Sequence, residues 1–314
     1  MFNLIQYTLV FTSVLILVAL GGMFSERSGV INIGLEGIMV FGAMGGAMAM
    51  VLLPDNFNAF LTVVITLLSA IAAGVVGSLL LAVACINFKA DQTLVGTAIN
   101  MLATAFAVVF IKAFNTQRSN GSDFSAYLAY IKQQEHFVFQ IGELRLNLFM
   151  IVTLVLLFVA YVVLYKTRFG LRLMACGEHP QAAASVGINV YKMRYAGVMI
   201  SGGLGGLGGL VYIASVNSTW NFEVGVAGAG FLALAVMIFG QWKPLKIAAA
   251  ALLFGFFQSL SYVYMGFGWL SSIPHSGEIL KIMPYVVSLI VLAFTSGKSR
   301  APKAEGIPYD KGMR

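Results

Sequence analysis

Long apolar stretches recur along almost the whole 314-residue chain and constrain its fold more than any other feature. Nine of them cover residues 4–24, 35–53, 58–84, 94–114, 147–165, 195–216, 227–240, 247–267 and 279–296. A helix needs about 20 largely apolar residues to cross a hydrocarbon core of about 30 Å. Only 10% of the side chains are charged, whereas a soluble domain carries about 25%. This excludes a soluble enzyme, a disordered chain and a nucleic-acid binder.

The period-2 alternation of a membrane barrel is absent. The sequence therefore predicts an all-α, polytopic integral membrane protein with about nine (eight to ten) transmembrane helices. One or two of them are expected to be broken or re-entrant. Stretch 35–53 follows a glycine-punctuated lead-in, and stretch 227–240 is short and opens with two glycines. Such segments indicate helices that line a transport pathway, although ordinary short helices with packing glycines stay open as an alternative.

Lysine and arginine residues are distributed unevenly between the predicted loops. One alternating assignment puts fourteen of the 19 on the same side, which the positive-inside rule makes cytoplasmic. Residues 1–296 then form one transmembrane domain with an extracytoplasmic loop at 115–146 and a cytoplasmic loop at 166–194. The polar tail, 297–314, is expected to be cytoplasmic and disordered. Nine spans put the N-terminus outside, and an extra half-helix within 25–53 would reverse that.

Motifs for catalysis, nucleotide binding and metal binding are missing. The sequence contains no phosphate-binding loop, no H-E-x-x-H and no G-x-S-x-G, and its three histidines are far apart. The glycine run 202–209 lacks the lysine and the flanking strand of a nucleotide loop. It is expected to let two helix backbones approach closely. The chain is therefore predicted not to be an enzyme and to carry no cofactor or metal of its own.

Polar side chains inside or beside apolar stretches are candidates for a solute pathway, because burying them in a membrane is costly without a partner. The candidates are Asn32, Glu36, Thr97, Asn100 and Trp220. Glu36 is equally explained as a helix N-terminal carboxylate or a salt-bridge partner. Thr97 and Asn100 share one helix face, which could hydrogen-bond a solute or another helix. Trp220 also fits the aromatic belt at a membrane interface.

The cytoplasmic loop contains a short predicted helix, which Pro180 begins and Gly187 ends. Its small side chains, Ala182, Ala183 and Val186, form a smooth face. A small-faced helix held between two spans can insert into a cleft on another protein and transmit rigid-body motion. An interfacial helix without a partner is the alternative.

This short helix, with Glu178 before it, resembles the coupling helix of an ABC importer permease. Residues 26–39, 166–172 and 228–240 resemble the branched-chain amino acid / simple sugar permease family. Within that family the chain is most similar to the nucleoside (guanosine or purine) uptake permeases. The resemblance covers most of residues 21–296.

The resemblance implies a membrane subunit in which Glu178, Pro180, Ala182, Ala183, Val186 and Gly187 couple to a cytoplasmic ABC ATPase. That ATPase would bind ATP and magnesium. The other implied partners are a second, related but different permease and an extracytoplasmic solute-binding lipoprotein. We expect a multi-pass protein of the cell membrane, surrounded by lipid and binding no nucleic acid. A permease for a simple sugar or a branched-chain amino acid, or an ion-coupled secondary transporter, remains an alternative.

Overall fold

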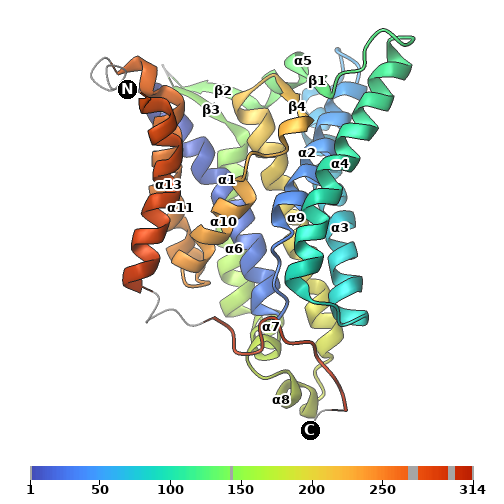
Figure 1. Ribbon diagram of the computed structural model, residues 1–314, viewed down its shortest axis with the longest axis vertical. Helices are drawn as coiled ribbons and strands as arrows, with labels where there is room; N and C mark the ends of the chain where they lie inside the picture. The colour runs from blue at the N-terminus through green and yellow to red at the C-terminus, as the bar shows by residue number, and fades with distance from the viewer. Residues whose placement is uncertain (1, 142–143, 268–274, 296–300, 313–314) are drawn as a thin grey trace.

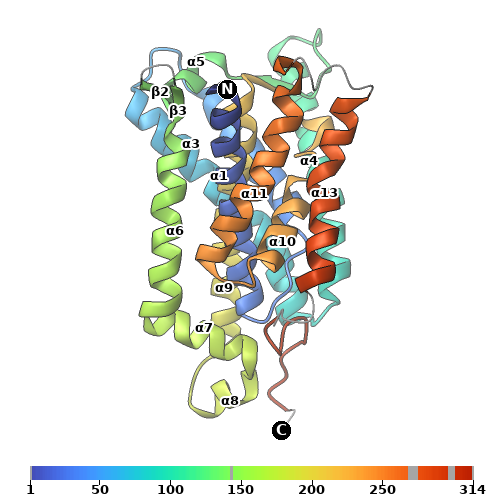
Figure 2. The same cartoon turned by 90° about the vertical axis from the view of Figure 1, so that its left-hand side faces the viewer.

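The computed structural model describes residues 2–141, 144–267, 275–295 and 301–312, most of them in helices that run between the two ends of the molecule (Figures 1 and 2). Seven helical segments in these residues are long and apolar enough to cross a membrane. They are α1 (Phe2–Arg27), α2 (Leu35–Leu52), α3 (Ala59–Ala82) with the π-helical turn η1 (Val83–Asn87), α4 (Gln92–Arg118), α6 (Leu148–Lys166), α9 (Val190–Val216), and α11 (Pro244–Val263) with η4 (Tyr264–Gly266). The remaining apolar helices are α10 (Ala229–Phe239) and α13 (Ser276–Thr295). All nine predicted stretches coincide with helices.

Two helices, α2 and α10, follow non-helical backbone. Residues 28–34, called the lead-in here, separate α1 from α2 and contain Gly29 at φ 95°. Before α10, Gly225 and Gly228 also have positive φ values. With 11 residues, α10 is about 16 Å long and too short to cross the hydrocarbon core. Figures 1 and 2 place it in the middle of the bundle rather than at an end. The predicted breaks are confirmed.

Helix α9 lies at the centre of the bundle and packs against α1, α2 and α3. Its glycine run makes this possible. A Cβ on Gly206 would lie 2.5 Å from the Ala70 carbonyl oxygen and 2.8 Å from the Gly74 Cα of α3. A Cβ on Gly42 of α2 would collide with the Gly206 backbone. The glycines therefore serve helix packing, as predicted, because backbones this close leave no room for a side chain.

Small strands and turns cap one end of the bundle. Strand β1 (Tyr127–Ala129) pairs antiparallel with β4 (Thr219–Asn221), and β2 (Val138–Ile141) pairs with β3 (Leu144–Asn147). The helical turns α5 (Ile131–Gln134), η2 (Glu135–Phe137) and η3 (Phe222–Val224) complete this cap. Helices α7 (Arg168–Glu178) and α8 (Pro180–Ser185) lie at the opposite end, together with residues 301–312 (Figure 1).

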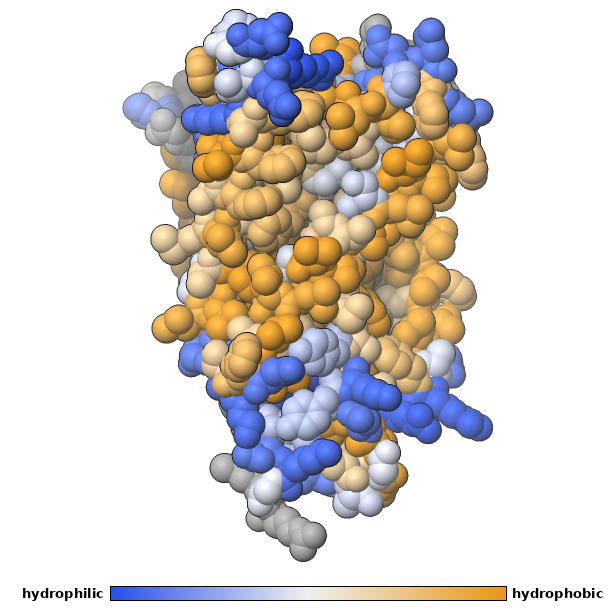
Figure 3. All heavy atoms as spheres, turned by 90° about the vertical axis from the view of Figure 1, so that its right-hand side faces the viewer, coloured by the Kyte–Doolittle hydropathy of each residue, from blue (hydrophilic) through white to orange (hydrophobic). Residues whose placement is uncertain are grey.

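The outer surface of the bundle is apolar between two polar ends. Figure 3 shows this belt on the face formed by α3 and α4. Large side chains on it are strongly exposed, such as Phe60 of α3 (74%) and Met101 of α4 (77%). Exposed apolar residues on this scale are stable in lipid and unfavourable in water. The chain is a multi-pass membrane protein.

The tail differs from its prediction. The sequence predicts disorder for residues 297–314, but residues 301–312 pack against the end of the bundle that carries α7 and α8. The remaining positions of that range, 297–300 and 313–314, lie outside the described residues. Ala304 and Tyr309 are each only 6% exposed. The prediction of disorder rested on polar composition and missed these two anchors, whose contacts come from distant helices.

Candidate translocation site

The amides of Ser28, Gly29 and Val30 still donate to the last carbonyls of α1. Beyond them the lead-in forms no helix, so other groups must satisfy its backbone. The Ser25 hydroxyl donates to the Val30 carbonyl at 2.7 Å. The backbone amide of Ile31 donates to Oε1 of Gln92 at 2.6 Å. The side chains at the ends of α1 and α4 thus replace the hydrogen bonds that a continuous helix would make.

Asn100 of α4 completes this pairing. Its Nδ2 donates to the Ile33 carbonyl at 3.0 Å, and its Oδ1 accepts from the Gly37 amide at 2.8 Å. Between Gln92 and Asn100 stands Gly96, where a Cβ would lie 2.9 Å from the Gly34 nitrogen. Both polar ends of the Asn100 amide are therefore committed to the break before α2, and α4 approaches the lead-in at backbone contact.

Glu36 joins the beginnings of the two interrupted helices, α2 and α10. Its Oε1 accepts from the Gly228 amide at 2.8 Å and its Oε2 from the Gly230 amide at 2.7 Å. These amides form the first turn of α10, where the helix dipole favours negative charge. A Cβ on Gly230 would lie 2.6 Å from the Glu36 backbone. Of the interpretations left open by the sequence, the structure selects a helix N-terminal carboxylate, and the helix it caps is not its own.

Asn32 is fully buried in the lead-in. Its Nδ2 donates to the Ser201 hydroxyl of α9 at 2.9 Å. Its Oδ1, like Nε2 of the buried Gln92, has no hydrogen-bond partner among the described residues. Buried polar atoms normally have a partner, so these two uncharged atoms are candidates for binding a polar solute. The Nη2 of Arg194, 2.9 Å from a Cβ on Gly29, is a further unpartnered group beside the lead-in.

Two predicted pathway residues lie elsewhere. Thr97 is exposed on α4, and its hydroxyl donates only to the Leu94 carbonyl of its own helix. Trp220 lies on the segment that leads into α10, where its Nε1 donates to the Gly225 carbonyl at 2.9 Å. Its ring packs edge-on against Tyr212 at 5.5 Å. The structure therefore gathers Asn32, Glu36 and Asn100 around the lead-in and leaves these two apart.

Sequence reasoning missed Gln92 and Ser201. The signal for Gln92 is present, because Gln92, Gly96 and Asn100 recur every four residues and so share one face of a helix. No comparable pattern marks Ser201, whose role depends on the side chain of Asn32 in a distant segment.

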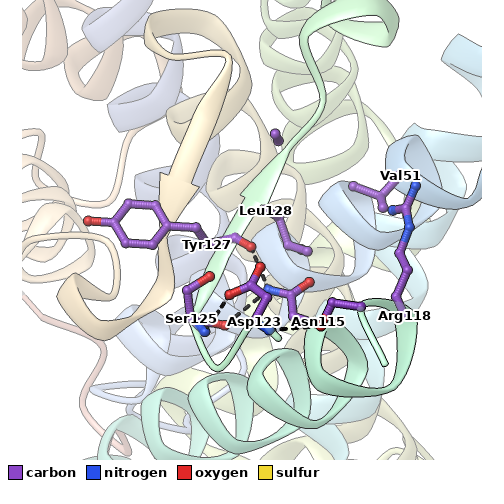
Figure 4. A pocket seen from close by; sticks show the side chains of 9 residues that line it. Val51, Asn115, Arg118, Asp123, Ser125, Tyr127 and Leu128 are labelled. Atoms are coloured by element: carbon purple, nitrogen blue, oxygen red, sulfur yellow. Dashed lines mark hydrogen bonds between the residues drawn. The ribbon is translucent and has the colours of Figure 1, made fainter. Parts of the chain in front are cut away.

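A cavity of about 450 Å³ opens at the capped end, between α4 and β1 (Figure 4). Its polar groups are largely paired with one another: the Asn115 Nδ2 donates to the carbonyls of Ser125 and Tyr127 at 3.0 and 2.8 Å. The Ser125 amide donates to Oδ1 of Asp123 at 2.8 Å, which lowers the pKa of that carboxyl. The hydrogen bonds of Asn115 hold the strand β1 beside α4. The cavity itself is separate from the lead-in.

Helix α8, the helix predicted to couple to an ATPase, has the predicted boundaries but exposes a different face. Pro180 stands in the first turn of α8, and Gly187 follows the helix at φ 84°. Ala182 and Val186 are exposed, the latter by 75%. Ala183 is only 4% exposed and packs against Cys176, Val190 and Tyr309. The predicted smooth face of three residues is thus wrong for Ala183, since consecutive residues of a helix lie about 100° apart.

Glu178 is the last residue of α7 and is half-buried. Together, α7 and α8 form a small unit at the end of the molecule opposite the cap, where α8 projects beyond the long helices (Figure 2). Across the described ranges, no group of three or more histidine, cysteine, aspartate or glutamate side chains is arranged to hold a metal ion.

Comparison with known proteins identifies the family. Residues 4–294 match the family described as the permease component of the branched-chain amino acid transport system. The guanosine ABC transporter permease protein NupQ of Bacillus subtilis is 40% identical over 99% of this chain and 97% of its own length. The nucleoside permease NupC of Lactococcus lactis is 40% identical over 96% and 95%. A second guanosine permease of Bacillus subtilis, NupP, is 25% identical over 90% and 78%. A bundle with two interrupted helices and an apolar belt suits a transport protein rather than an enzyme. The chain belongs to the branched-chain amino acid transport system permease family.

Proposed function

We propose that this chain is the membrane subunit of an ATP-driven importer of nucleosides. The names of the two 40% identical relatives support the substrate class. The observation that carries the transport role is the junction at Glu36, where two helices that begin inside the bundle meet. Helices interrupted within a membrane are typical of substrate pathways.

The chemistry of the lead-in suits a neutral, polar solute. Both carboxylate oxygens of Glu36 accept hydrogen bonds from the beginning of α10, so neither is left for a solute. The unpartnered Asn32 Oδ1 and Gln92 Nε2 are one acceptor and one donor, both uncharged. The charged Arg194 lies at the Gly29 end of the lead-in, where residues 301–312 cover it. A nucleoside offers hydroxyl and base groups that match such atoms. A zwitterionic amino acid would need charged partners for its ammonium and carboxylate groups. In the proposal these atoms become accessible when α2 and α10 move apart. Trp220, on the segment that leads into α10, would lie along the path toward the capped end, whereas Thr97 faces away from it.

The end that carries α7 and α8 is cytoplasmic in this proposal, because it holds the basic side of the uneven cation distribution. The exposed face of α8 then docks into a cytoplasmic ABC ATPase, which supplies the site for ATP and magnesium. ATP binding would move α8 as a rigid body and shift the bundle between its two access states.

Two further partners complete the proposed importer. The cap of strands and helical turns, on the opposite end, would receive a solute-binding lipoprotein. The apolar surface of α3 and α4 would pack partly against lipid and partly against a second permease. Two guanosine permeases of Bacillus subtilis, NupQ and NupP, are 40% and 25% identical to this chain, which favours a related but different second chain over an identical one.

Transport by the complete complex in sealed vesicles tests the proposal. We expect uptake of radiolabelled guanosine that requires ATP and stops with a non-hydrolysable analogue. A proton gradient alone should support none. Unlabelled adenosine should compete, whereas ribose and leucine at the same concentration should not. Competition by ribose or leucine alone would instead assign a sugar or amino-acid substrate. Uptake driven by the gradient without ATP would overturn the importer itself.

A further inference from the structure

Residues 301–312, called the tail segment here, cross the end of the bundle. They touch α7 and α8, which together are called the coupling unit. The Ala304 amide donates to the Gly177 carbonyl of α7 at 2.8 Å. Tyr309 packs among Cys176 of α7, Ala183 of α8 and Val190 of α9. The tail segment thereby holds α7, α8 and the first turn of α9 together.

The ring of Tyr309 also stands edge-on to that of Tyr191 at 5.3 Å. Further along, Asp310 pairs with Lys89, between η1 and α4, at 2.7 Å. Both partners of this pair are more than 40% exposed, so the ion pair adds little stability. The buried aromatic contact is the stronger of the two.

The same twelve residues also touch the lead-in. A Cβ on Gly306 would lie 2.8 Å from Cδ1 of Ile31, and one on Gly29 would lie 3.4 Å from the Ala304 carbonyl oxygen. The carboxyl group of Glu305 lies beside that of Glu26, at the end of α1. One short segment therefore contacts both the coupling unit and the interrupted backbone before α2. It reinforces a direct contact of α7, since a Cβ on Gly177 would lie 3.4 Å from the Gly29 nitrogen.

The bridge buries polar atoms that it satisfies only in part. Arg194 of α9 is 1% exposed, and its Nη1 donates to the Ile307 carbonyl at 2.9 Å. Its Nε and Nη2 have no partner among the described residues, and the same holds for Oε2 of Glu305. Burying incompletely paired charged groups is costly. These atoms reduce the net free energy of docking, so we expect the loss of a large apolar contact to detach the tail segment.

We propose that the tail segment is a positioning element of coupling, which must be docked for the full movement of α8 to reach the lead-in of α2. This inference rests on the proposed importer function. In it, Tyr309 is the positioning residue, because its ring contacts α7, α8 and α9 at once. With the tail segment undocked, α7 would keep only its direct contact at Gly29, so less of the movement of α8 would reach the lead-in.

The first experiment measures whether the tail segment is docked, and it needs no transported solute. Cys176 is buried in the same apolar cluster as Tyr309, and Cys85 is the other cysteine of the chain. In the complete complex carrying Cys85→Ala, we expect Tyr309→Ala to raise the rate of maleimide labelling of Cys176 by about tenfold or more. The matched control is Ile307→Ala, whose side chain is 55% exposed and whose contact uses only its backbone carbonyl. Equal labelling rates in the two variants would overturn the docked arrangement.

The second experiment measures coupling, as the number of solute molecules imported for each ATP hydrolysed. We expect Tyr309→Ala to keep the ATPase rate of the complex within about twofold while this ratio falls about fivefold or more. Tyr309→Phe should restore the ratio, because the ring and not the hydroxyl makes the contacts. An unchanged ratio, or a parallel loss of hydrolysis and uptake, would overturn the coupling role. If the unmodified complex imports no nucleoside, the proposed substrate fails. The coupling role is then decided by ATP-dependent labelling of Ile31→Cys, which should change in the parent protein but not with Tyr309→Ala.

Discussion

The carboxylate of Glu36 accepts a hydrogen bond from the backbone amide of Gly230 at 2.7 Å, which fastens the first turn of α2 to the first turn of α10. The two helices are nearly 200 residues apart in sequence. A second bond, from Gly228 at 2.8 Å, uses the remaining carboxylate oxygen. One side chain thus holds both interruptions of the bundle in register, and it offers the most direct place to disturb the pathway.

Replacing Glu36 by glutamine should weaken this junction, because an amide has one acceptor oxygen and its NH₂ group would face a backbone N–H. A hydrogen bond to a charged group contributes about 1.5–3 kcal/mol. We expect a lower thermal midpoint in detergent and uptake reduced at least several-fold. Glu178→Gln, at the half-buried end of α7, is the control and should leave the midpoint unchanged. Equal midpoints and uptake for Glu36→Gln and the parent protein would show that the junction is dispensable.

Asn100→Ala should destabilise the protein, because it leaves the Ile33 carbonyl and the Gly37 amide without their partner. Each buried, unsatisfied group costs about 1–3 kcal/mol. Thr97→Ala, on the same helix, removes a hydroxyl that bonds only within α4 and should be nearly neutral. Thermal unfolding monitored by tryptophan fluorescence compares the two. If Thr97→Ala proves the more damaging variant, Asn100 does not support the lead-in.

The packing of α9 gives a prediction with a matched pair of glycines. Gly206→Ala places a Cβ 2.5 Å from the Ala70 carbonyl oxygen, and this backbone atom cannot move aside. Overpacking of this kind costs about 1–3 kcal/mol. At Gly203 the nearest atom is a methyl group of Ile71 at 3.3 Å, so alanine should be tolerated or slightly stabilising. Folded yield and thermal midpoint in detergent are the readouts, and similar losses at both positions would contradict the close packing.

Aspartate on α8 should act differently at two adjacent positions. Ala182 is exposed, so Ala182→Asp should abolish co-purification of the ATPase and leave the thermal midpoint of the permease unchanged. Ala183 is buried among Cys176, Val190 and Tyr309, so Ala183→Asp should lower the midpoint, because an unpaired charge is costly there. Retained ATPase binding in Ala182→Asp would remove α8 from the docking surface.

The stability of the tail segment should depend on pH through Glu305. Burial raises the pKa of this carboxyl to about 7, although the hydrogen bond to Glu26 and the charge of Arg27 act in the opposite direction. A pKa above the unfolded value means that the folded state binds the proton more tightly, so stability falls as pH rises from about 4.5 to about 7. The thermal midpoint should therefore decrease from pH 5 to pH 8. Glu305→Gln should flatten that change, and an identical slope in both proteins would refute the assignment.

Much of the fold follows from local properties of the sequence. The nine apolar stretches match the helices, because a membrane span is recognised from its own residues. The interruptions before 35–53 and within 227–240 are likewise visible from their glycines. Pro180 and Gly187 set the ends of α8 through their backbone conformations. Each of these inferences needs only one segment and the environment around it.

Only the tertiary structure shows which distant segments contact one another. Glu36 was recognised as a carboxylate at a helix start, but only the packed bundle shows that it caps α10. The burial of Ala183 and the docking of residues 301–312 likewise depend on Tyr309 and Cys176, which meet only when distant segments pack. Local periodicity determines which residues form helices, because it reflects contacts within a few turns. Hydrogen bonds and burial between distant segments have no such periodic signal, so the tertiary structure alone decided how the coupling unit, the tail segment and the two interrupted helices are joined.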